Sequence, residues 1–130
     1  MYRRNTGRRG ENLAGRYLVS RRYTILERNY RTPFGEIDIV AERDGVTVFL
    51  EIKTRISEKA GPPLASITAA KQRHMIRSCQ YYLLKHDLAD TPCRIDAISV
   101  NLDQDCRLKV LKHLKNAFGT EAAECRHNHK

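Results

Sequence analysis

The spacing of apolar and polar residues along the chain predicts a helix followed by short strands. From Gly10 to about Arg22, apolar residues recur with the spacing of one helix face. The residues of this apolar stripe are Leu13, Ala14, Tyr17 and Leu18. Further along, short β-branched and aromatic runs bounded by turn residues indicate strands. The later predicted elements are strands over Tyr23–Tyr30, Glu36–Glu42, Val46–Lys53 and Arg94–Leu102, and a helix from Ser66 or Thr68 to His86.

The segments between and beyond these elements complete the predicted organisation. Ile56–Ala65 contains Gly-Pro-Pro and is predicted to be a loop, while Arg107–Phe118 is ambiguous between strand and helix. Residues 1–9 are expected to form a flexible basic N-terminus and residues 120–130 a disordered tail. Residues 10–119 suit one domain and are too short for two. The order of elements favours an α/β fold, with helices flanking a mixed sheet.

The Asp44-Gly45 pair is a strong signal for a hairpin between two of the predicted strands. If these two residues form the loop, Arg43 faces Val46 and the numbers of all facing residues sum to 89. This register makes one face wholly apolar, as a buried sheet face requires. Its apolar pairs are Ile37 with Ile52, Ile39 with Leu50, and Ala41 with Val48. The pairs on the opposite face are Glu36 with Lys53, Asp38 with Glu51, and Val40 with Phe49.

The placement of Asp38 opposite Glu51 predicts a metal site. Like charges directly opposite each other destabilise a sheet, so a cation is expected between these carboxylates. Mg²⁺, or Mn²⁺ in its place, is suitable because Mg²⁺ is usually held by one or two carboxylates together with water and phosphate. The backbone carbonyl of Ile52 can add a ligand, and Lys53 can orient or deprotonate an attacking water or stabilise the phosphorane. The alternative is an ordinary ion pair of Lys53 with Glu36 beside solvent-exposed acids.

Glu11 lies on the apolar stripe of the first helix, three residues before Ala14 and seven before Leu18. It is therefore expected to point at whatever the helix packs on. The simpler explanation is an acid in the first helical turn that is favoured by the helix dipole.

Positive charge is concentrated at the start of the chain. The net charge is +9, and residues 1–31 hold nine arginines against two acids, a local charge of +7. This distribution favours a polyanionic partner such as nucleic acid. A basic, solvated surface is the alternative explanation. The candidate phosphate contacts in this segment are Arg8, Arg9, Arg16 and Arg31.

Several other classes of protein are not indicated. No segment approaches the roughly 18 consecutive apolar residues of a membrane span, and no apolar stretch follows the Arg-rich start to make a signal peptide. A cytoplasmic protein with no membrane partner is expected. The four cysteines lack C-x-x-C spacing, so reduced thiols are expected rather than a zinc site. The histidines without an acid or nucleophile at an interpretable spacing are His74, His86 and His113.

Several motifs together resemble a known family. These motifs are Gly10-Glu11, Asn29-Tyr30-Arg31, Gly35-Glu36-Ile37-Asp38-Ile39-Val40, Val48-Phe49-Leu50-Glu51-Ile52-Lys53-Thr54-Arg55, Lys71-Gln72-Arg73, Arg94-Ile95-Asp96 and Asn116-Ala117-Phe118. From about residue 7 to 119 the chain looks like the YraN-like family of small bacterial proteins. Asp38 with Glu51-x-Lys53 also resembles the PD-(D/E)XK nuclease superfamily, which has a restriction-endonuclease-like core. The family is similar in turn to archaeal Holliday-junction resolvases.

The resemblance implies a role for each matching residue. Asp38 and Glu51 would be metal ligands, Lys53 the catalytic lysine, and Glu11 the helix acid that approaches the metal. Further nucleic-acid contacts would be Arg55 and Lys71. The resolvase relatives act as dimers on four-way junctions, so a homodimer is one expectation. The proline of the superfamily name is absent, because Ile37 precedes Asp38.

The leading hypothesis is a Mg²⁺-dependent nuclease that hydrolyses phosphodiester bonds of DNA, with branched or structured DNA among the candidate substrates. The alternative is a non-catalytic nucleic-acid-binding protein that retains the nuclease fold, since a fold does not by itself imply turnover. A protein-interaction domain without a nucleic-acid role is a third hypothesis.

Overall fold

The computed structural model describes residues 2–56 and 67–117, with side chains from Thr6 onward. Its elements are α1 (Tyr2–Ser20), β1 (Thr24–Thr32), β2 (Gly35–Arg43), β3 (Val46–Ile56), α2 (Ala69–Lys85), β4 (Cys93–Leu102) and β5 (Leu108–Leu114). In this part of the chain the strands form one five-stranded sheet in the order β1-β2-β3-β4-β5. Strands β3 and β4 are parallel, and the other neighbours are antiparallel. The α/β fold with a mixed sheet that was expected from the sequence is confirmed.

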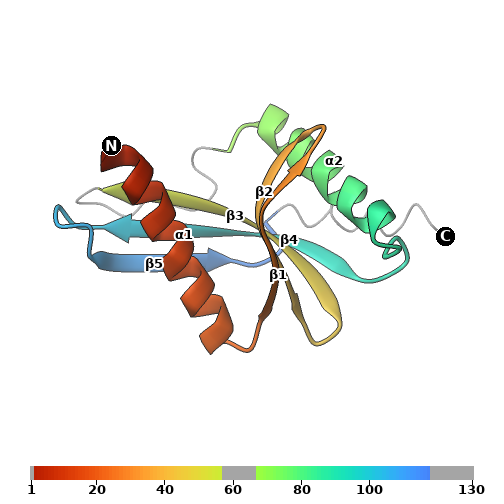
Figure 1. Cartoon of the computed structure of the whole chain (residues 1–130), viewed down its shortest axis with the longest axis horizontal. Helices are drawn as coiled ribbons and strands as arrows, with labels where there is room; N and C mark the ends of the chain where they lie inside the picture. Colours follow the sequence, from red (N-terminus) through yellow and green to blue (C-terminus); the bar gives the residue numbers. More distant parts are fainter. Residues whose placement is uncertain (1, 57–66, 118–130) are drawn as a thin grey trace.

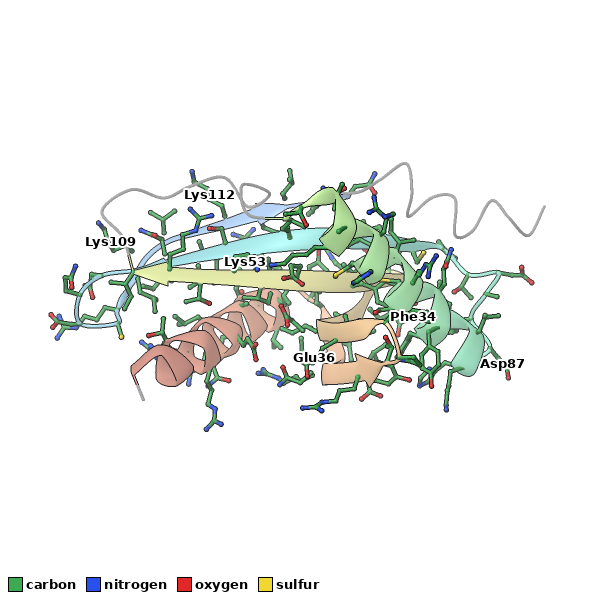
Figure 2. All side chains as sticks on the ribbon, turned by 90° about the horizontal axis from the view of Figure 1, so that it is seen from above. Phe34, Glu36, Lys53, Asp87, Lys109 and Lys112 are labelled. Carbon is green, nitrogen blue, oxygen red and sulfur yellow. The ribbon has the colours of Figure 1, made fainter. Side chains whose placement is uncertain are left out.

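The two helices cover opposite faces of the sheet (Figure 1). α1 packs Ala14 and Leu18 against one face, whereas α2 packs Met75, Cys79 and Tyr82 against the other, over the β1–β2 hairpin. Figure 2 shows α1 and the first turn of α2 on either side of β3. Because helices cover both faces of the sheet, its central strands carry buried apolar residues at successive positions. The prediction of a single apolar face was therefore too narrow.

α1 begins earlier than the apolar stripe indicates. It starts at Tyr2, so residues 2–9, which were expected to be flexible, are helical. No proline interrupts this segment, and arginine is a good helix former. Gly10, where the helix was expected to begin, instead lies where α1 passes close to β3, because a Cβ there would overlap the side chain of Thr54. The glycine permits this close approach of helix and sheet.

Other boundaries follow local sequence signals. The ambiguous stretch Arg107–Phe118 contains strand β5. The side chain of Thr68 caps α2, since its Oγ1 accepts a hydrogen bond from the backbone N–H of Lys71 at 3.1 Å. Ile56 ends β3, and the rest of the predicted loop, like the predicted tail 120–130, lies outside the described residues.

Two expectations from composition concern the cysteines and the membrane. Cys79 and Cys93 are buried and Cys106 is half-buried, and the reduced state of the thiols stays a prediction. Within residues 2–56 and 67–117, no helix is both long enough and apolar enough to cross a membrane. The cytoplasmic location stays a prediction.

The predicted hairpin register is confirmed for the half nearest the turn. β2 and β3 pair from Arg43–Val46 to Ile39–Leu50, with residue numbers that sum to 89. The described ladder ends there, so the rest of the predicted register was wrong. The predicted pairs that it lacks are Ile37 with Ile52, Asp38 with Glu51, and Glu36 with Lys53.

β2 and β3 separate because they follow different partners beyond this point. β3 remains paired with β4 as far as Ile56–Leu102, while β2 bends away with β1 toward α2 (Figure 1). Ile37 accordingly packs in the α2 cluster, whereas Ile39 packs in the α1 cluster. The carboxylate of Asp38 takes the place of the missing strand partner, since its Oδ2 accepts a hydrogen bond from the backbone N–H of Ile52 at 2.8 Å.

Candidate functional site

Two carboxylates lie at the point where β2 and β3 separate. Asp38, from β2, is held by its hydrogen bond to the backbone of Ile52. Glu51, the preceding residue on β3, is half-buried, and the Nζ of Lys53 lies 3.6 Å from its Oε2. The structure thus brings together the three residues that the sequence singled out. At Asp38, β2 and β3 are joined by a hydrogen bond from a backbone N–H to a side chain, and not by the continuous ladder that was expected.

The surroundings of Asp38 disfavour its charged form. Burial is the main cause that raises the pKa of Asp38 from 3.8 to about 7, and repulsion by Glu51 adds to this shift. The hydrogen bond from the Ile52 N–H opposes it, because that bond favours the ionised carboxylate. Glu11 and Glu36 contribute further repulsion. A cation beside Asp38 would relieve this unfavourable arrangement.

Glu51 and Glu11 share this electrostatic environment. Burial raises the pKa of Glu51, while the ammonium groups of Lys53 and Lys71 act against the increase. Burial also raises the pKa of Glu11. In turn, Glu11 contributes to the raised pKa of both Asp38 and Glu51. α1 therefore brings its acid toward the carboxylate pair, as expected from the place of Glu11 on the apolar stripe.

The alternative explanation for Lys53, an ion pair with Glu36, is wrong. Lys53 is paired with Glu51, and the side chains of these two residues are only 26% and 20% exposed. Glu36 instead lies 3.6 Å from the Nε of Arg31, on the neighbouring strand β1. That pair is exposed and contributes little to stability. The ammonium of Lys53 is thus directed to the carboxylate pair.

The donor atoms at this point suit a hard divalent cation. In the described ranges 2–56 and 67–117, no three or more His, Cys, Asp or Glu side chains are grouped so that they could hold a metal ion. A structural zinc site would need such a group. Mg²⁺ needs less protein, because water and substrate phosphate usually complete its oxygen ligands. Asp38 and Glu51, with the carbonyl of Ile52 between Glu51 and Lys53 along β3, fit this requirement.

A comparison with protein families matches residues 10–100 to the Uncharacterised protein family UPF0102. The chain belongs to the UPF0102 family. A UPF0102 protein of Geotalea uraniireducens is 44% identical over 116 residues, which cover 88% of this chain and 90% of that protein. One from Dehalococcoides mccartyi is 42% identical over 120 residues, with 92% and 97% covered. The YraN-like resemblance is confirmed, and the wider PD-(D/E)XK relationship stays a prediction.

The predicted phosphate contacts of this UPF0102 member lie on several elements. Arg55 lines a groove of about 630 Å³ between α1 and the end of β3, which Glu11 and Lys53 also line. Lys71, on α2, approaches Glu51 from the other side. Arg9 also serves the fold, because its Nε donates a hydrogen bond to a backbone carbonyl 3.0 Å away, before β5. The exposed members of the predicted set are Arg8, Arg9, Arg16, Arg31 and Lys71.

A basic residue that the sequence pattern did not indicate lies in line with Lys53. Lys53 pairs with Ser99 on β4, and Ser99 pairs with Lys112 on β5. Because directly paired residues share a face of a sheet, the two lysines lie on the same face (Figure 2). Lys112 could not be placed from the sequence, since its segment was ambiguous between strand and helix.

A buried charged network that no sequence spacing indicated joins β4, β5 and α1 in this UPF0102 member. Asp96 on β4 is fully buried, 2.9 Å from the Nε of Arg94 and 2.8 Å from the Nε2 of His113. The other ring nitrogen of His113 lies 2.7 Å from the hydroxyl of Tyr17 on α1. Burial opposes ionisation of Asp96, but the hydrogen bonds from His113 and Arg94 outweigh it and lower the pKa. Sequence spacing did not indicate Asp96 as the partner of His113, because the two residues come from neighbouring strands.

Proposed function

We propose that this chain is a Mg²⁺-dependent nuclease that hydrolyses phosphodiester bonds of DNA. The observation that carries the proposal is the pair Asp38 and Glu51 at the opening between β2 and β3, with Lys53 3.6 Å from Glu51. A half-buried carboxylate beside a second carboxylate is unfavourable for folding alone. Strongly perturbed acids of this kind are concentrated at functional sites.

Each residue of the site has a distinct part in this proposal. Asp38, Glu51 and the backbone carbonyl of Ile52 would hold the metal ion, with Glu11 as a nearby acid from α1. Bound Mg²⁺ would supply Lewis-acid polarisation of the phosphoryl group and a lower pKa for its water. Lys53 would orient the attacking water or stabilise negative charge that develops on the phosphate. Its contact with Glu51 keeps the ammonium within reach of the carboxylates.

The distribution of positive charge supports a nucleic-acid substrate. Lys71 and Arg55 lie on either side of the carboxylate site. Lys112 extends the positive charge across the sheet from Lys53. Phosphate contacts release counterions from DNA, so binding should weaken steeply as the salt concentration rises.

The finer parts of the proposal rest on the motif resemblance. They are a restriction-endonuclease-like core, a preference for branched DNA, action as a homodimer and a cytoplasmic location. Light scattering with and without junction DNA would test the homodimer, since a monomer in both conditions contradicts it.

The deciding experiment compares purified wild-type protein with Asp38→Asn on junction, duplex and single-stranded DNA, with and without Mg²⁺. Asparagine keeps an oxygen that can accept the bond from Ile52 but removes the charge. Glu42→Gln changes an exposed acid on the same strand and is the matched control. We expect Mg²⁺-dependent cleavage by the wild type and by Glu42→Gln only. If clean wild-type protein cuts none of these DNAs, or Asp38→Asn cuts them equally well, the proposal is overturned.

Binding without cleavage would favour the alternative, a nucleic-acid-binding protein that keeps this fold without turnover. In that case Asp38→Asn should bind DNA as tightly as the wild type or more tightly, because negative charge near the phosphates is lost. Fluorescence anisotropy over a series of salt concentrations measures this difference.

A further inference from the structure

A second pocket adjoins the carboxylate pair on the α2 side. It has a volume of about 180 Å³ and is lined by the tip of the β1–β2 hairpin, by α2 and by Glu51. This volume is below the roughly 300–1,000 Å³ of pockets for drug-sized ligands, so it suits a single ring system. The lining includes Phe34, Glu51, Ile67, His74, Met75 and Ser78.

One hydrogen bond joins the hairpin tip to α2 and two more hold the tip itself, so the pocket is already formed. The Oγ1 of Thr32 lies 2.8 Å from the Oγ of Ser78, and it accepts a bond from the backbone N–H of Phe34 at 3.0 Å. It also donates to the carbonyl of Gly35 at 2.8 Å. Gly35 has a φ of 143°, a conformation that is almost restricted to glycine. The turn is therefore held in one conformation that presents Phe34.

Phe34 is an aromatic side chain that the core does not use. It is 39% exposed and lies outside both hydrophobic clusters of the described residues. Figure 2 shows it beside α2, where the guanidinium of Arg77 lies 5.8 Å from its ring centroid. Proteins that bind single-stranded nucleic acids stack bases on aromatic rings and on arginine planes. Phe34 lines the same pocket as Glu51, and Arg77 lies over its ring.

We propose that this pocket takes one unstacked nucleobase of the substrate strand, with the base against Phe34 and the adjoining phosphate toward Asp38 and Glu51. The proposal rests on the proposed nuclease function and specifies its substrate. Glu51 belongs to both the pocket and the carboxylate pair, so base and scissile phosphate come from the same or adjacent nucleotides. Lys71, in the same pocket wall, supplies positive charge for the backbone.

This arrangement selects for nucleic acids whose bases are free to leave the stack. Removing a base from a perfect duplex costs stacking and pairing energy, which is least where the base is already unpaired. Single-stranded flaps, gaps and branch points are therefore the preferred substrates, and an intact duplex is a poor one.

Phe34 could have a purely structural role, in which it packs the hairpin tip on α2. Leucine can make such a contact but has no ring for stacking, whereas tyrosine keeps the ring. Comparison of Phe34→Leu with Phe34→Tyr therefore separates stacking from packing. Leu84→Ala removes a 67% exposed apolar side chain elsewhere on α2 and is the matched control.

The experiment measures binding of a labelled DNA that carries a single-stranded flap, whose branch point fixes the register. The protein carries Asp38→Asn so that no strand is cut. We expect Phe34→Leu to weaken binding by about 5- to 150-fold, the range for one base stacked on an aromatic ring. Phe34→Tyr and Leu84→Ala should bind like the parent protein. The melting temperature of every variant is measured in parallel.

A set of flaps with an abasic site at successive positions identifies the base. One position should weaken binding to the parent by the same factor as Phe34→Leu, and should have no further effect on Phe34→Leu. Equal binding by Phe34→Leu and Phe34→Tyr, or additive losses at every position, overturns the pocket proposal. The nuclease proposal is decided separately, by Mg²⁺-dependent cleavage and Asp38→Asn. Failure of the parent to bind any of these DNAs also overturns the pocket proposal.

Discussion

Replacement of Asp38 by asparagine should stabilise the metal-free protein at neutral and alkaline pH. Asparagine has nearly the same size as aspartate and keeps an oxygen that can accept the hydrogen bond from the Ile52 N–H. It removes the charge that burial and Glu51 disfavour. The variant tests whether this carboxylate lowers the stability of the fold.

The magnitude follows from the pKa of Asp38. Its ordinary value of 3.8 rises to about 7 in the folded protein. Each unit corresponds to about 1.4 kcal/mol, so the ionised carboxylate should lower the free energy of unfolding by up to about 4 kcal/mol. The buried amide of asparagine loses hydrogen bonds to water, which offsets part of the gain. We expect a net increase in the free energy of unfolding of about 1–3 kcal/mol for Asp38→Asn.

The same pKa fixes the direction of the pH dependence. Below about pH 4 Asp38 is protonated in the folded and the unfolded protein, and it makes no difference to stability. Between about pH 4 and pH 7 the folded protein keeps a proton that the unfolded chain releases, so stability falls as the pH rises. Above about pH 7 the full penalty is present. The advantage of Asp38→Asn should therefore grow between about pH 4 and pH 7 and then level off.

Urea unfolding in EDTA, followed by circular dichroism over a pH series, measures this effect. The control is Glu42→Gln, which should show no comparable gain because Glu42 is an exposed acid on the same strand. Mg²⁺ supplies a second measurement, because a ligand at about 100 times its dissociation constant stabilises its protein by about 2.7 kcal/mol. The wild type should gain this stability, and Asp38→Asn should gain much less.

Two results would refute the reasoning on Asp38. In the first, the wild type is as stable as Asp38→Asn at a pH above the pKa of Asp38 in the folded protein, which is about 7. In the second, Asp38→Asn has an advantage that does not change with pH, which would point to packing and not to charge.

Three further changes test the fold around the site, each by urea unfolding. Asp96→Asn should lower the free energy of unfolding by about 3–5 kcal/mol, because it leaves the half-buried guanidinium of Arg94 without its buried carboxylate partner. Asp105→Asn, an exposed control, should change it by less than about 0.5 kcal/mol, and equal effects would contradict the buried network. Gly35→Ala should lower it by about 1–3 kcal/mol, because of the φ of 143°, and an unchanged midpoint would show that the turn accepts other conformations. Gly10→Ala should lower it by about 1–3 kcal/mol through overlap with Thr54, and addition of Thr54→Ala should recover part of this loss; no recovery would contradict the close approach of α1 to β3.

A local sequence signal, the Asp44-Gly45 turn, predicted the part of the β2–β3 ladder that lies nearest to it. Between Arg43–Val46 and Ile39–Leu50, the two-residue Asp44-Gly45 turn fixes which residues face each other, so this part of the register could be predicted from the sequence. The end of this ladder could not be predicted. It depends on the long parallel pairing of β3 with β4 and on the packing of β1 and β2 against α2, which are contacts between distant segments.

In the candidate site, too, local spacing predicted some positions, whereas others depend on contacts between segments that are far apart in the sequence. Alternation along β3 placed Glu51 and Lys53 on one face, and helical spacing directed Glu11 toward the sheet. The bond of Asp38 to the Ile52 N–H requires the strands to separate, which no alternation pattern encodes. The Asp96–His113 contact was missed for a related reason, because it depends on the β4–β5 register.

The separation of β2 from β3 creates both the carboxylate site and the pocket. A continuous ladder would have set Asp38 directly opposite Glu51, an arrangement that repulsion disfavours. The opening gives Asp38 a backbone partner, and Gly35 and Glu36 from the hairpin line the pocket together with Glu51. Glu51 is the residue that the two sites share. Glu51→Gln should therefore weaken Mg²⁺-dependent stabilisation and also alter binding of an unstacked base, whereas Phe34→Leu should alter base binding alone.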